Sequence, residues 1–214
     1  MAFERSAIPN AITVARIALA PVVGFLAFVP TFTARLLAFI LFLVAAFSDL
    51  WDGHLARKYG WISDFGKLVD PIADKLLLVM TFLPFYILSH RGDAYGQLVV
   101  IGRMPLWILV VIFGRELLIT IIRSVAANRG VVIPAGKSGK LKAVFQNIFI
   151  GTALAWLAIH SAALTRGWIG MQSWTWWTWF HGFVFMTSLV IAIFLTVYSL
   201  GVYLLEWRRL MTRP

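Results

Sequence analysis

Long apolar runs alternate with short polar segments along the whole chain. An α-helix needs about 20 apolar residues to cross a bilayer core about 30 Å thick. Six runs approach this length, at about 11–29, 34–52, 69–89, 104–127, 143–164 and 181–205. The pattern predicts an all-α membrane protein with six transmembrane helices, preceded by a short interfacial segment at residues 1–10.

Composition favours a membrane protein over a soluble domain. Hydrophobic residues make up 61% of the 214 positions and charged residues 13%. No repeat or low-complexity segment divides the chain, so we expect residues 1–214 to form a single integral membrane domain. The first apolar run is long enough to remain as a span, and no cleavable signal peptide is evident. Without cysteine, disulfides and thiolate metal sites are excluded.

Basic residues are unequally distributed over the segments that join the spans. If the N-terminus is cytoplasmic, 15 of the 19 Lys and Arg residues fall on inner segments. The four on outer segments are Arg35, Arg91, Arg103 and Arg166. The positive-inside rule therefore predicts that both termini are cytoplasmic. The net charge of +10 then reports topology, and no nucleic-acid partner is expected.

Acidic residues concentrate between Asp49 and Asp74, a stretch that holds five of the nine in the chain. Asp49 and Asp52 lie three residues apart near the end of the second span. Asp70 and Asp74 lie four apart on the third, so each pair shares a helix face. We expect Pro71 in or near the first turn of that helix, because proline is tolerated there. The two helix ends are predicted to face each other across a short loop, residues 58–65.

Four carboxylates close together repel one another, and a divalent cation removes that repulsion. Oxygen ligands without cysteine or histidine favour Mg²⁺ or Mn²⁺ over zinc. Magnesium bound by carboxylates usually completes its coordination shell with substrate phosphates, and nearby arginine and lysine donate to phosphate oxygens. The sequence therefore indicates phosphoryl-group chemistry on a lipid, at the cytoplasmic edge of the membrane.

Polar residues on the first span allow two interpretations. Asn10, Thr13 and Arg16 follow one another at intervals of three and share one face of the helix. Either Asn10 caps the helix and Arg16 extends to the interface, or the three residues form a polar wall of the acidic site.

Charged residues around the fourth and fifth spans are equally open to two interpretations. Arg115 and Glu116 either pair within the bundle or belong to the site. Lys137, Lys140 and Lys142 either mark topology and bind lipid headgroups, or form an anion-binding mouth. The tryptophans of the last outer loop indicate an interfacial belt, with sugar stacking as the alternative: Trp168, Trp174, Trp176, Trp177 and Trp179.

Eight positions in the acidic stretch have a family's spacing. The pattern is Asp49-x2-Asp52-Gly53-x2-Ala56-Arg57-x8-Gly66-x3-Asp70-x3-Asp74. It resembles the full signature of the CDP-alcohol phosphatidyltransferases. The resemblance implies their six-helix bundle and the transfer of a phosphatidyl group from CDP-diacylglycerol to an alcohol, with release of CMP.

The resemblance also implies a role for each matching residue. Asp49, Asp52 and Asp70 would hold two Mg²⁺ or Mn²⁺ ions, with Asp74 contributing to one of them and acting as the general base. The residues implied in binding the CDP-lipid are Asn10, Thr13, Gly53, Ala56, Arg57, Ser63 and Gly66, the last of which is expected to open the third helix.

Three further segments, residues 8–21, 114–123 and 138–146, are similar to bacterial phosphatidylglycerophosphate synthases. This implies sn-glycerol 3-phosphate as the acceptor, the bacterial inner membrane as the location and a possible homodimer. The residues assigned to the acceptor phosphate are Arg115, Arg123, Lys137 and Lys140. Inositol phosphate, phosphatidylglycerol or serine remain alternative acceptors. A membrane transporter and a non-catalytic scaffold are the alternatives outside this enzyme class.

Overall fold

The computed structural model describes residues 7–59, 64–128 and 137–211, with side chains at 10–48, 59, 66, 69–128 and 139–209. This part of the chain forms six α-helices, a short 3-10 helix η1 (Ala94–Gly96) and no β-strand. The α-helices are α1 (Ala7–Phe28), α2 (Phe32–Tyr59), α3 (Asp64–His90), α4 (Leu106–Asn128), α5 (Lys137–Arg166) and α6 (Gln172–Met211). The predicted all-α membrane protein with six helices is confirmed.

Helix length and hydropathy identify the membrane-crossing elements. Four helices, α1, α3, α5 and α6, are long and apolar enough to cross a bilayer. The described apolar part of α2, Phe32–Ser48, is shorter, and α4 is interrupted by Arg115, Glu116 and Arg123. The 40 residues of α6 span about 60 Å at a rise of 1.5 Å per residue, about twice the hydrocarbon thickness. Part of α6 therefore extends beyond the membrane.

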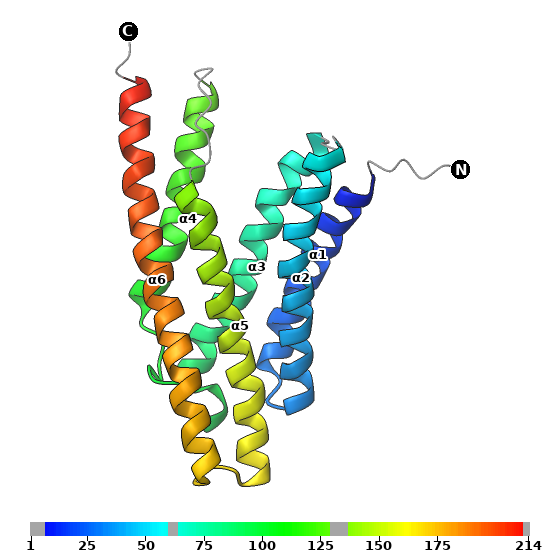
Figure 1. The fold of residues 1–214 in the computed structure, drawn as a ribbon, viewed down its shortest axis with the longest axis vertical. Coiled ribbons are helices and arrows are strands. Elements are labelled where there is room, and N and C mark those ends of the chain that lie inside the picture. The colour runs from blue at the N-terminus through cyan, green and yellow to red at the C-terminus, as the bar shows by residue number, and fades with distance from the viewer. Residues whose placement is uncertain (1–6, 60–63, 129–136, 212–214) are drawn as a thin grey trace, which may run out of the picture.

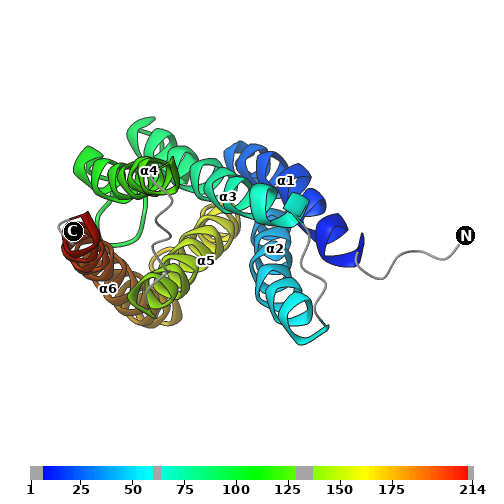
Figure 2. The same ribbon diagram turned by 90° about the horizontal axis from the view of Figure 1, so that it is seen from above.

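The six helices form two rows when the molecule is seen along its length (Figure 2). One row contains α1, α3 and α4, and the other contains α2, α5 and α6. Helix α1 packs against α2 and α3, and α5 packs against α2 and α6. The start of α1, the end of α2, the start of α3 and the end of α6 all lie toward one end of the bundle (Figure 1). We call this end of the bundle the cavity end, because the polar cavity lies toward it.

A close approach of two backbones fixes α1 against α3. A Cβ atom built on Gly24 would lie 2.7 Å from the carbonyl oxygen of Met80, so no larger residue fits without displacement. Deeper in the bundle, the ring of Phe149 packs 5.3 Å from that of Phe82 and 4.9 Å from that of Phe185. These three rings join α3, α5 and α6 in one apolar core.

Two expected helix starts are wrong. Helix α1 begins at Ala7, so Asn10 lies inside its first turn and is not the N-cap. Helix α3 begins at Asp64 rather than Gly66, which places Pro71 at its eighth position instead of in the first turn. The missing N–H of proline interrupts the backbone hydrogen bonds there. Hydropathy did not reveal these turns, because it marks where a helix meets hydrocarbon and not where the helix begins.

The tryptophan-rich segment is helical rather than a loop. Helix α6 begins at Gln172, so all but the first of the five tryptophans lie on its initial turns. Trp174 and Trp177 share a face and pack against the core, whereas Trp176 and Trp179 are 70% and 76% exposed. This division follows the helical period, and the interfacial belt remains a prediction.

Candidate active site

Two aspartates on α3 contact two polar residues on α1. The hydroxyl of Thr13 donates to Asp70 Oδ1 at 2.6 Å, and Arg16 Nη1 donates to Asp74 Oδ1 at 3.0 Å. Arg16 Nη2 also lies 3.7 Å from Asp70 Oδ1. Asp70 and Asp74 lie about one turn apart on α3, and Thr13 and Arg16 lie about one turn apart on α1. The contacts therefore form where the polar face of α1 meets the polar face of α3.

Burial differs across this contact. Thr13 and Arg16 are 1% and 2% exposed, whereas the side chains of Asp70 and Asp74 are 49% and 59% exposed. The α1 residues therefore hold the carboxylates from behind and leave them accessible. Of the two interpretations of the first span, the polar wall is the one that Thr13 and Arg16 satisfy.

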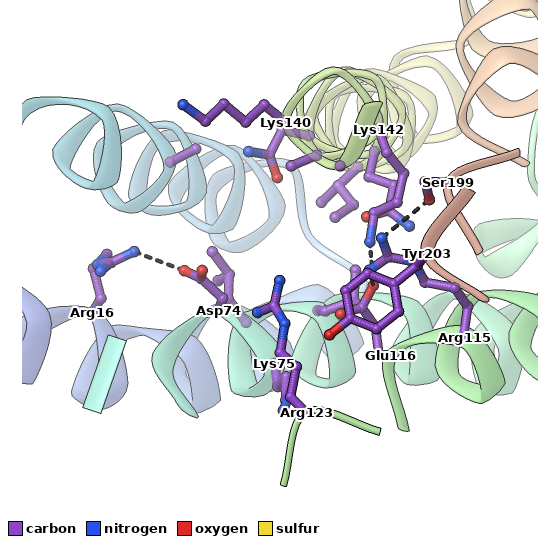
Figure 3. Close-up of a pocket in the computed structure, with 18 of the residues that line it drawn as sticks. Arg16, Asp74, Lys75, Arg115, Glu116, Arg123, Lys140, Lys142, Ser199 and Tyr203 are labelled. Carbon is purple, nitrogen blue, oxygen red and sulfur yellow. Dashed lines mark hydrogen bonds and ion pairs between the residues drawn. The ribbon is translucent and has the colours of Figure 1, made fainter. Parts of the chain in front are cut away.

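A cavity of about 380 Å³ opens beside Asp74, between the two rows of helices (Figure 3). All six helices contribute to its lining. Its basic residues are Arg16, Lys75, Arg115, Arg123, Lys140 and Lys142, and its acidic residues are Asp74, Glu116 and Glu206. Cations outnumber carboxylates two to one, so the cavity suits an anionic ligand that also meets a carboxylate.

Part of this positive charge is compensated by Glu116. Arg115 Nη1 lies 3.0 Å from Glu116 Oε1, and Lys142 Nζ donates to the same oxygen. Arg115 Nη2 also donates to Ser199 Oγ at 3.1 Å, which links α4 to α6. Pairing of Arg115 with Glu116 within the bundle is therefore confirmed. Because Arg115 also lines the cavity, the two interpretations of this residue are compatible.

Arg123 and Lys140 differ from the other cations of the cavity. Among the side chains that the structure describes, neither has an ion pair or a side-chain hydrogen bond. Arg123 lies over the ring of Tyr203, 5.7 Å from its centroid, a cation–π arrangement that positions the guanidinium. Lys75, by contrast, donates to Thr120 Oγ1 at 2.7 Å. Arg123 and Lys140 are thus the cations best placed to bind an external anion.

Other predicted site residues are located only in part. Asn10 lies on α1 one turn before Thr13, and Gly66 lies on the first turn of α3. Asp49, Asp52, Gly53, Ala56 and Arg57 are on the last turns of α2, and Lys137 begins α5, but their side chains lie outside the described residues. Ser63 lies entirely outside them.

The described side chains include some of the oxygen donors that a metal ion would need. No cluster of three or more candidate ligands occurs among the described His, Asp and Glu side chains. Asp70 and Asp74 supply accessible carboxylate oxygens, which are the donors that Mg²⁺ and Mn²⁺ prefer. The two aspartates therefore fit half of the expected ligand set.

Sequence reasoning assigned Lys75, Gln146 and Tyr203 no role in the site, although each lines the cavity, and it considered Lys142 only as part of an anion-binding mouth. Lys142 and Gln146 fall in the segment 138–146 that prompted the acceptor assignment, so proximity in sequence was an available signal. Tyr203 lies within a long apolar run and gives no such signal.

A second cavity, of about 480 Å³ and almost entirely apolar, lies along α2, α5 and the start of α6. Ala46 and Asn147 line both cavities, so the polar and apolar spaces meet at these residues. On α5 the apolar lining runs from Val144 to Ala155, about 16 Å at 1.5 Å per residue. This is close to half the thickness of a bilayer core, about 15 Å.

The family of the chain follows from comparison with known proteins. Residues 6–198 match the family model of the CDP-alcohol phosphatidyltransferases. The match covers most of the chain and includes α1 to α5 and most of α6. The chain belongs to the CDP-alcohol phosphatidyltransferase family, as the acidic motif predicted.

Individual relatives are named for one reaction. The chain is 40% identical over 133 residues to a probable phosphatidylglycerophosphate synthase of Mycobacterium tuberculosis, across 61% of the chain and 57% of that protein. It is 35% identical over 159 residues to a CDP-diacylglycerol–glycerol-3-phosphate 3-phosphatidyltransferase of Bacillus subtilis, across 69% and 76%. A Rickettsia bellii protein of the same name is 34% identical over 139 residues, across 65% and 70%. The match thus spans less than two thirds of the mycobacterial relative.

Proposed function

We propose that the chain transfers a phosphatidyl group from CDP-diacylglycerol to sn-glycerol 3-phosphate, giving phosphatidylglycerophosphate and CMP. The observation that supports this most is the cavity in which accessible Asp74 faces an excess of arginine and lysine. Such a site suits a phosphorylated alcohol, whose phosphate needs cations and whose hydroxyl needs a base. The names of the relatives point to the same acceptor.

In the proposed mechanism, Arg123 and Lys140 bind the phosphate of the acceptor, together with Lys137 and the partly compensated Arg115. Asp74 accepts the proton of the acceptor hydroxyl. The hydroxyl oxygen forms a bond to the β-phosphorus of the donor, the one attached to diacylglycerol, and the bond from that phosphorus to the CMP oxygen breaks. Arg16, which donates to Asp74, holds the carboxylate in place.

We further propose that Asp49, Asp52, Asp70 and Asp74 bind two Mg²⁺ or Mn²⁺ ions. Asp52 lies seven residues before the end of α2, and Asp70 lies six after the start of α3, which is about 10 Å and 9 Å along the two helices. Similar depth supports a shared site. A bound divalent ion would polarise the attacked phosphorus and neutralise charge on departing CMP.

The donor lipid would occupy both cavities. Its CDP group would contact Asn10, Thr13, Gly53, Ala56, Arg57, Ser63 and Gly66, the residues assigned by the family motif. The apolar cavity meets the polar one at Ala46 and Asn147 and has the depth of one leaflet, which supports its use by an acyl chain. The charge distribution supports a site on the cytoplasmic side of a bacterial inner membrane. A homodimer is part of the same proposal, by family resemblance.

The experiment that tests this function is an acceptor panel with CDP-diacylglycerol and Mg²⁺ or Mn²⁺ held constant. The purified chain is incubated with glycerol 3-phosphate, inositol phosphate, phosphatidylglycerol or serine, and CMP and lipid products are measured. We expect metal-dependent CMP release with glycerol 3-phosphate alone. Turnover only with another acceptor would overturn the acceptor assignment. No CMP release with any acceptor would favour a transporter or a scaffold.

A further inference from the structure

Besides Nε of Arg115, two uncharged buried polar atoms on the wall of the polar cavity have no hydrogen-bond partner among the described residues. They are the hydroxyl of Tyr203, on a residue 6% exposed, and Nε2 of Gln146, on a residue 4% exposed. Buried polar groups in proteins are almost always hydrogen-bonded, because an unmade bond costs the desolvation of the group. Each exception therefore requires an explanation, and the two uncharged atoms on Gln146 and Tyr203 line one cavity.

Their neighbours hold them in place. Gln146 follows Lys142 by one turn of α5, and Tyr203 follows Ser199 by one turn of α6. Lys142 is bound to Glu116, and Ser199 is bound to Arg115, so both turns are fixed by α4. Figure 3 draws Tyr203 among the side chains that line the cavity, and the guanidinium of Arg123 lies over its ring. The unpaired atoms thus occur on facing helices with fixed positions.

The chemistry of the two atoms indicates an uncharged partner. An amide N–H only donates, whereas a tyrosine hydroxyl both donates and accepts, and a ligand hydroxyl complements both. In the proposed function, the cations of the cavity bind the phosphate of the acceptor. The proposed acceptor has two hydroxyls, one that reacts and one that does not.

We propose that Gln146 and Tyr203 bind the non-reacting hydroxyl of a phosphorylated polyol acceptor and so determine which alcohol the site accepts. This inference rests on the proposed function. A site that hydrogen-bonds a substrate hydroxyl discriminates strongly against analogues that lack it, because its own polar groups then stay unpaired. The ligand class is therefore a phosphate ester with a hydroxyl adjacent to the reacting carbon.

The test removes one hydroxyl from the protein and, separately, one hydroxyl from the substrate. Wild type and Tyr203→Phe are assayed with sn-glycerol 3-phosphate and with 3-hydroxypropyl phosphate, which lacks the second hydroxyl. We expect Tyr203→Phe to lower kcat/KM for glycerol 3-phosphate at least tenfold and to leave that for 3-hydroxypropyl phosphate within twofold. Gln146→Met should behave alike. Tyr198→Phe, on the same helix but 54% exposed, is the matched control and should change neither value.

Thermal stability separates recognition from structure. Because the Tyr203 hydroxyl has no partner among the described residues, its removal should leave Tm unchanged or raise it. A lower Tm with equal losses on both acceptors would assign the hydroxyl to folding and overturn the proposal. Unchanged kinetics on both acceptors would also overturn it. If wild type releases no CMP with glycerol 3-phosphate, the proposed function fails instead, and the two failures are thereby distinguished.

Discussion

The two ends of the bundle each bury an arginine, and they use it differently. Arg35, at the end away from the cavity, is 1% exposed and donates to Ala27 O, Tyr95 O, Leu157 O and Ser161 Oγ. Arg16, at the cavity end, is 2% exposed and contacts two carboxylates that remain half exposed. Arg35 is surrounded by neutral oxygens that belong to the fold. Arg16 supports groups that are accessible to a ligand.

The comparison shows that burial of a charge does not by itself indicate function. Around Arg35, carbonyl and hydroxyl oxygens from α1, η1 and α5 receive the guanidinium, so this residue joins three elements. Around the cavity, some cations have no carboxylate partner. Arg123 and Lys140 lack an ion pair among the described side chains. The site is therefore distinguished by carboxylates that are accessible and by cations that have no described ion pair, and not by the burial of a charge.

The largest effect should come from Asp74→Asn. An amide cannot accept the proton of the acceptor hydroxyl, and a general base contributes about 100- to 10,000-fold to rate. We expect kcat to fall by at least about 100-fold, measured as CMP release, while CDP-diacylglycerol binding is largely retained. Asp93→Asn is the control at the other end, where Asp93 Oδ1 accepts from the backbone N–H of Gly96. That variant should keep kcat, and an Asp74→Asn enzyme with normal kcat would exclude the base.

Replacing Arg35 should affect stability and not chemistry. Arg35→Met keeps much of the side-chain volume but leaves the carbonyls of Tyr95 and Ala27 without their guanidinium donor, a loss of about 3 kcal/mol at 1–3 kcal/mol per group. We expect Tm in detergent to fall by roughly 6–12 °C. KM and kcat of the folded fraction should stay unchanged. The control Arg91→Met removes an exposed arginine that lies over Phe28, and it should shift Tm by much less.

Replacing Arg123 should affect acceptor binding and not stability. Loss of a charge-assisted hydrogen bond, worth about 1.5–3 kcal/mol, corresponds to a rise of about 10- to 150-fold in KM for glycerol 3-phosphate. We expect this for Arg123→Gln, with an unchanged KM for CDP-diacylglycerol. The loss should be equal for 3-hydroxypropyl phosphate, because both acceptors have a phosphate. Arg166→Gln, at the far end of α5, is the control, and a similar KM change in that variant would assign the effect to overall charge.

The sequence predicted the helices better than their ends. Long apolar runs are required to cross a bilayer, so six of them predicted six helices. Their polar ends were predicted less well: α2 continues to Tyr59, two residues into the expected loop, α3 begins at Asp64 rather than Gly66, and α6 begins at Gln172. Backbone hydrogen bonds continue a helix into water, whereas hydropathy reports only the part in hydrocarbon. The same limitation assigned the tryptophans of α6 to a loop.

The candidate site was predicted where its residues contrast with their surroundings. Asp70, Asp74 and Arg123 are charged groups in an apolar chain, and their spacing indicated a site before any geometry was known. Gln146 and Tyr203 were not predicted, because what distinguishes them is that a buried polar atom of each has no hydrogen-bond partner among the described residues. That property depends on how α4, α5 and α6 pack around the cavity, which cannot be inferred from the order of residues.

The smallest effect should come from Gly24→Ala, which tests how the α1–α3 contact supports the cavity end. The added methyl would lie 2.7 Å from Met80 O, a backbone atom that cannot rotate away. Overpacking costs about 1–3 kcal/mol, or roughly 2–12 °C in Tm. Because the same helix pair presents Thr13 to Asp70, a displaced α1 should also raise KM for the donor. Gly201→Ala is the matched control: no atom lies near its Cβ, so alanine should leave Tm unchanged or raise it, and equal Tm losses in both variants would exclude a special α1–α3 approach.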